Sequence, residues 1–188
     1  MSIDGPPAGL WGGNIRRDIP SRTLAPDQAM APDDLRLEFA TAHPSRPEVL
    51  TFLRYWATRH PGGGAPAAIA PLLPNTYLAE RADGDWRFSV FGSALVERLG
   101  ADPTGHAIAD ILPVGTADAL AHLFNGVVWR RAAMAVAGRW SSRAAPEARF
   151  EAAHVPLTGR DRAARLVFGC IAFFPDHRPD HRPDRRPA

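Results

Sequence analysis

The sequence predicts one α+β domain, in which a five-stranded antiparallel sheet carries helices on one face and an N-terminal helix on the other. Strand-like alternation occurs in five segments, two before and three after a helical stretch. The last of these segments is apolar on both faces, which is typical of a strand that is covered on both sides. The 188 residues, 45% hydrophobic and 22% charged, suffice for one ordinary domain.

Prolines are concentrated at both ends of the chain and divide it into three parts. We expect a disordered Pro-rich arm over 1–44, the folded domain over 45–175 and a disordered tail over 176–188. The tail repeats Asp-His-Arg-Pro, and a proline at every fourth position favours neither helix nor sheet. Within the arm, the short apolar piece 35–40 indicates a helical turn and no packed unit.

The first helix of the domain is expected to begin at Ser45. Ser45 and Glu48 have the N-cap and N3 spacing of a capping box. Apolar residues share one face of this helix: Val49, Leu50, Leu53, Trp56 and Ala57. This face is the natural cover for the outer side of the sheet, either within the chain or against a partner.

Two strands are expected next, at 75–80 and 86–91, and Asp83-Gly84-Asp85 between them is typical of a hairpin loop. In the second strand Trp86, Phe88 and Val90 alternate with polar residues, as in a half-buried strand. Short helices at 93–99 and 108–112 and a longer one at 116–130 follow.

Three strands, at 134–140, 148–157 and 164–174, are expected to complete the sheet. The last strand places Leu166, Phe168, Cys170 and Ala172 on one face and Val167, Ile171 and Phe173 on the other.

Five short motifs lie in order along the chain: YWA at 55–57, PLLPNTYL at 71–78, FSVFGSAL at 88–95, LGADPTG at 99–105 and RFE at 149–151. Together they resemble PAS domains, in particular a subfamily of mostly uncharacterised single-domain proteins common in alphaproteobacteria. The resemblance covers about residues 48–174. It departs at 62–66, GGGAP, where that subfamily usually has a basic segment with acidic flanks.

The resemblance implies a non-enzymatic sensory or protein-interaction module in bacterial signalling. A ligand in such folds lies between the sheet and the helices, so the expected lining residues are Phe88, Val90, Leu112, Leu120, Phe124 and His154. The N-terminal helix and the outer sheet face are expected to mediate a homodimer, or to bind a signalling protein partner, at Leu50, Leu53, Trp56, Ile171 and Phe173. The identity of a ligand or cofactor stays open.

Composition excludes several other classes. All 22 basic residues are arginines, so the chain has no lysine for a Walker A motif or a Schiff base. The single cysteine, Cys170, excludes an internal disulfide. A net charge of +2 does not favour nucleic acid. Without a signal peptide or an apolar run that could span a membrane, a cytoplasmic protein is expected.

Two alternatives remain open. One is a small cone-shaped α+β enzyme that uses Glu151 or His154 in an apolar pocket, which requires a convergent polar pair with perturbed pKa values. These two residues are three apart on one strand and so face opposite ways, and we expect no catalytic pair and no metal site. The other is a structural adaptor whose filled core holds no ligand. His122, on the long helix, is expected to face solvent.

Overall fold

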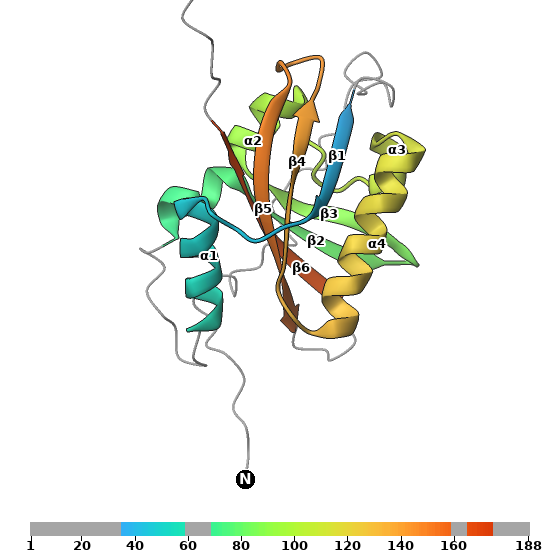
Figure 1. Cartoon of the computed structure of the whole chain (residues 1–188). Coiled ribbons are helices and arrows are strands. Elements are labelled where there is room, and N and C mark those ends of the chain that lie inside the picture. The colour runs from blue at the N-terminus through green and yellow to red at the C-terminus, as the bar shows by residue number, and fades with distance from the viewer. Residues whose placement is uncertain (1–34, 59–68, 159–164, 175–188) are drawn as a thin grey trace, which may run out of the picture.

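The computed structural model describes residues 35–58, 69–158 and 165–174. In chain order the elements are β1 (Arg36–Thr41), α1 (Pro47–Ala57), η3 (Ala70–Asn75), β2 (Thr76–Ala82), β3 (Asp85–Phe91), α2 (Ser93–Leu99), α3 (Ile108–Ile111), α4 (Val114–Arg130), β4 (Met134–Ser141), β5 (Ala148–Thr158) and β6 (Arg165–Phe173). The strands form one antiparallel sheet in the order β1-β4-β5-β6-β2-β3. α1 lies on one side of this sheet and α4 on the other, which confirms the predicted α+β layers (Figure 1).

The predicted strand count is wrong, because the sheet has six strands rather than five. The additional strand, β1, lies where the sequence indicated only a helical turn, and it pairs with β4. Leu37 and Phe39 alternate with polar residues and pack against the inner core, so the segment has the period of a strand. Gly138 on β4 permits this pairing, since a Cβ there would overlap the Glu38 carbonyl oxygen.

A β-bulge changes the facing of residues at the end of β3. The register shifts between Leu78 and Ala79, so that Phe88 pairs with Ala79 but Val90 with Leu78. Directly paired residues share a face, and Tyr77, the neighbour of Leu78, is on the inner face with Phe91. Val90 therefore lies on the outer face, and the prediction that it lines an inner pocket with Phe88 is wrong.

The sheet separates two apolar clusters. The inner cluster lies under α2, α3 and α4, and the outer one lies under α1. α1 contributes Val49 and Phe52, both 0% exposed, and the Phe52 ring meets Phe168 edge-on with centroids 4.9 Å apart. The helix is thus rotated from the predicted orientation, with Leu50 and Leu53 only half-buried.

The predicted capping box is also wrong. Arg46 is the N-cap of α1, and no side chain caps the helix. Within 35–58, 69–158 and 165–174, none of the helices combines the length and the hydrophobicity of a membrane-spanning segment.

Candidate functional site

Tyr77 and His154 form a polar pair in the inner core. β2 supplies Tyr77 and β5 supplies His154, and the tyrosine hydroxyl lies 2.5 Å from Nδ1 of the imidazole. Both side chains are 3% exposed, and the ring of Phe124 on α4 lies 6.1 Å from the imidazole, centroid to centroid. Gly169 on β6 leaves the room that the Tyr77 ring occupies, because a Cβ there would overlap the ring.

Burial fixes the protonation of this pair. It lowers the pKa of His154 to about 3 and raises that of Tyr77 well above its usual value. The tyrosine hydroxyl therefore stays protonated and donates a hydrogen bond to Nδ1 of His154. The neutral imidazole then carries its own hydrogen on Nε2. Nε2 is buried and has no hydrogen-bond partner within the described chain, so one polar atom faces the inner core unpaired.

With the exception of Val90, the predicted apolar lining residues belong to the same inner cluster as Tyr77. Phe88, Leu112, Leu120 and Phe124 are all buried in the inner cluster. Phe91 takes the place expected for Val90, with its ring centroid 4.9 Å from that of Phe88.

Glu151 lies on the opposite face of β5 and holds the start of α1. Its carboxylate accepts hydrogen bonds from the Ser45 N–H at 2.7 Å, the Ser45 hydroxyl at 2.6 Å and the Arg46 N–H at 2.8 Å. Burial alone would raise the pKa of this carboxyl, but the three hydrogen bonds and the charge of Arg46 outweigh burial and lower it. Since Glu151 and His154 lie on opposite faces, they form no acid–base pair.

Removing the charge of Glu151 is expected to loosen α1. We predict that Glu151→Gln lowers the free energy of unfolding by about 2 kcal/mol at pH 7, because hydrogen bonds to a charged group are lost. The folded-state pKa is lowered, so this contribution is present above the unfolded pKa of about 4.3 and is lost as pH falls through the folded value. Urea unfolding of both proteins at several pH values measures the difference.

Glu147→Gln is the matched control, because Glu147 makes only an exposed ion pair with Arg139 at 3.1 Å. It should change stability by less than about 0.5 kcal/mol. Equal stability of Glu151→Gln and the wild type would show that the carboxylate does not anchor α1.

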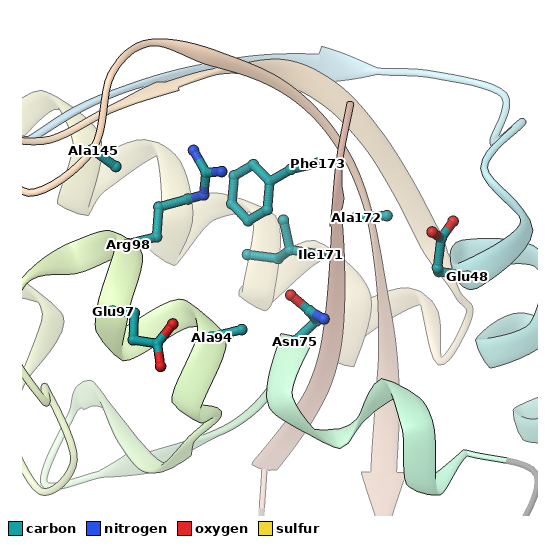
Figure 2. A pocket seen from close by; sticks show the side chains of 9 residues that line it. All are labelled: Glu48, Asn75, Ala94, Glu97, Arg98, Ala145, Ile171, Ala172 and Phe173. Atoms are coloured by element: carbon teal, nitrogen blue, oxygen red, sulfur yellow. The ribbon is translucent and has the colours of Figure 1, made fainter. Parts of the chain in front are cut away.

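A groove of about 470 Å³ opens at the end of β6. Figure 2 shows Arg98 stacked against Phe173 on one side of the strand and Glu48 on the other, with Asn75 in front of the strand. The Arg98 guanidinium carbon lies 4.0 Å from the centre of the Phe173 ring. Arg98 Nη1 and Glu48 Oε2 are both buried without a hydrogen-bond partner in the described segments.

A family model described as "PAS domain" matches residues 47–172. The chain belongs to the PAS domain family. PAS domains are generally sensory and signalling modules without enzymatic activity, and they often mediate protein–protein interactions. The comparisons with curated proteins and with solved structures gave no match.

The residues predicted for a dimer interface of this PAS domain divide between two faces. Leu50, Leu53 and Trp56 belong to α1, and the Trp56 indole N–H donates to the Pro156 carbonyl at 3.4 Å. Ile171 and Phe173 pack against the inner cluster instead. The alternation of β6 is the reason, because α1 covers the face that carries Cys170 and Ala172.

Sequence reasoning missed two residues of the PAS domain that now stand out. Tyr77 lies on a strand that was expected, but the hydrogen bond to His154 depends on β2 and β5 lying on either side of β6. Arg98 cannot be singled out in the sequence, because the chain has 22 arginines and no lysine. Cys170 is buried, as expected, and burial raises the pKa of its thiol to about 12. His122 is exposed to solvent, as expected.

Proposed function

We propose that this PAS domain is a non-enzymatic, cytoplasmic sensory module of bacterial signalling that dimerises through α1 and the outer face of the sheet. A ligand or a protein partner would change signalling by altering the stability of that dimer. One observation carries the proposal: an apolar row on the outer face continues beyond the helix that covers part of it.

The row crosses four neighbouring strands. Val90 on β3 pairs with Leu78 on β2, Leu78 with Phe168 on β6, and Phe168 with Val155 on β5. Paired residues share a face, so the four side chains are adjacent. Val155 is fully buried in the cluster under α1, whereas Leu78 and Val90 remain half-buried.

α1 contributes more apolar surface to the same side of the molecule. Leu50 is half-buried there and is not part of the packing against the outer cluster, whereas Val49 and Phe52 are fully buried in it and half-buried Leu53 packs against it. A second copy, related by a two-fold axis, would offer the same half-buried residues and cover both surfaces at once. This geometry supports a homodimer more directly than it supports an unrelated partner.

The oligomeric state tests the proposal. We expect native mass spectrometry and sedimentation to show a dimer, and Leu50→Glu or Val90→Glu to raise its dissociation constant at least about tenfold, because a charge is then buried at the interface. Thr51→Glu, on an exposed position of α1, is the matched control and should leave the dimer unchanged. A wild-type protein that stays monomeric at about 100 µM would rule the proposal out.

A further inference from the structure

We propose that β1 forms a second contact between copies of this chain, in which two β1 strands pair antiparallel about a two-fold axis at Leu37. The two sheets then continue into one another. The contact uses no residue of the outer row, and it goes beyond the proposed dimer because it links one dimer to the next.

β1 has one backbone edge that no described segment pairs with. It is the last strand on its side of the sheet, and within the described part of the chain its strand partner is β4 alone. The Ala42 N–H donates to the Ala135 carbonyl at 3.0 Å, so every second residue before Ala42 also bonds to β4. The N–H and C=O groups of Leu37 and Phe39 therefore point away from β4, along the free edge.

The strand at the other end of the sheet, β3, is partly covered by the chain after α2. The Phe88 N–H donates to the His106 carbonyl at 3.3 Å, and the Phe88 carbonyl accepts from the Gly105 N–H at 2.7 Å. Among the described residues, no such hydrogen bond reaches the outer backbone groups of β1. β1 also contains neither a proline nor a bulge, two devices that prevent strand edges from pairing.

The charges of β1 are complementary to those of a second, antiparallel copy. Pairing about Leu37 places Arg36 opposite the partner's Glu38, and Glu38 opposite the partner's Arg36. Both side chains are exposed, and neither makes an ion pair with another described residue. Arg139 of β4 is the cross-strand neighbour of Glu38 on the other side. Each Glu38 would thus lie between two arginines.

The same pairing covers apolar surface on the inner face. Leu37 meets its own copy, and Leu35 lies opposite the partner's Phe39. Leu35 is 2% exposed, whereas Leu37 and Phe39 are only half-buried where they pack against the inner cluster. A neighbouring strand would cover the remainder of these two side chains.

Charge selects this register among those that the free backbone groups allow. An axis at Glu38 would place the two Glu38 carboxylates opposite each other, which is destabilising. An axis at Phe39 would place Glu38 opposite Ala40 and leave Arg36 without an acidic partner. The contact consists of a few backbone hydrogen bonds and two exposed ion pairs, so we expect a dissociation constant of about 1 mM.

Disulfide cross-linking of the full chain tests the register. A mixture of Arg36→Cys and Glu38→Cys chains, one of them isotope-labelled, should form a mixed disulfide because these two positions lie opposite each other. Arg36→Cys mixed with Ala40→Cys is the matched control and should cross-link at least about tenfold more slowly. Cys170 is buried and does not compete. All chains also carry Leu50→Glu and Val90→Glu, so that the outer dimer does not contribute.

Charge reversal in the same background is the second test. Glu38→Arg alone and Arg36→Glu alone place like charges opposite each other, and each should weaken self-association at about 1 mM by about tenfold. Mixing these two chains should restore association, and so should combining both changes in one chain. Sedimentation equilibrium measures the three cases. The chain with both changes also shows whether an arginine at position 38 is tolerated beside Arg139.

The proposal is overturned if the control pair cross-links as fast as the Arg36→Cys and Glu38→Cys pair, or if mixing the charge-reversed chains restores nothing. Slow amide hydrogen exchange of Leu37 and Phe39 in the dilute monomer would also overturn it, because another segment of the same chain would then occupy the edge. Amides that stay unprotected at about 1 mM protein would exclude a second copy and leave the edge to a different protein.

Discussion

Gly169→Ala is expected to destabilise the PAS domain by about 3 kcal/mol or more. A Cβ at this position would overlap Cζ and Cε1 of the buried Tyr77 ring, so the ring must move and its hydrogen bond to His154 must break. Overpacking of a core costs about 1–3 kcal/mol, and an unpaired buried polar group adds about 1–3 kcal/mol. For a domain of this size the melting temperature should fall by about 10 °C.

Gly115→Ala is the matched control, because a Cβ on this α4 residue meets no atom within 4 Å. It should melt at or slightly above the wild-type temperature, since alanine is the better helix former. If Gly169→Ala melts within about one degree of Gly115→Ala, Tyr77 is not packed against β6 as described.

The second large effect is a loss of stability in mild acid that depends on His154. Its folded-state pKa of about 3 lies below the unfolded value of about 6.5, so protons bind preferentially to the unfolded chain. Stability should therefore fall by about 1.4 kcal/mol for each pH unit below 6.5. Between pH 6.5 and 4.5, a window above the titration of Glu151, the loss should reach about 2.5 kcal/mol.

Urea unfolding at a series of pH values measures this slope. His154→Gln should remove most of it, whereas the exposed His122→Gln should retain it. Parallel pH profiles for His154→Gln and the wild type would show that the imidazole is not held neutral in the core.

The sequence predicted the positions of the helices and strands of this PAS domain better than it predicted which strands pair. The strands from β2 to β6 and helix α4 lie within a few residues of their expected positions, because each has a clear period and a turn signal at its ends. β1 was missed although Leu35, Leu37 and Phe39 alternate, because the surrounding prolines suggested an arm without structure. The partner of β1 lies far along the chain, and local propensity carries no information about it.

The candidate site was predicted less completely for the same reason. Phe88, Phe124 and His154 do come together in the inner core. Val90 left this group because a bulge inverted its facing, and Ile171 and Phe173 face away from α1. A bulge depends on the register of two strands, and the face that α1 covers depends on how this helix packs against β5 and β6. Neither can be inferred from one segment at a time.

The place of β1 in the sheet has a consequence for how the protein is made. β1 pairs with β4, and Ser45 with Glu151, 106 residues further on. A ribosome adds about 5–20 residues each second, so the first strand waits about 5–20 s for its partners. During that time Leu37 and Phe39 are synthesised but unpaired, and they can attract a chaperone or another nascent chain. β1 can thus join the sheet only after β4 has been synthesised, although it is translated before every other strand.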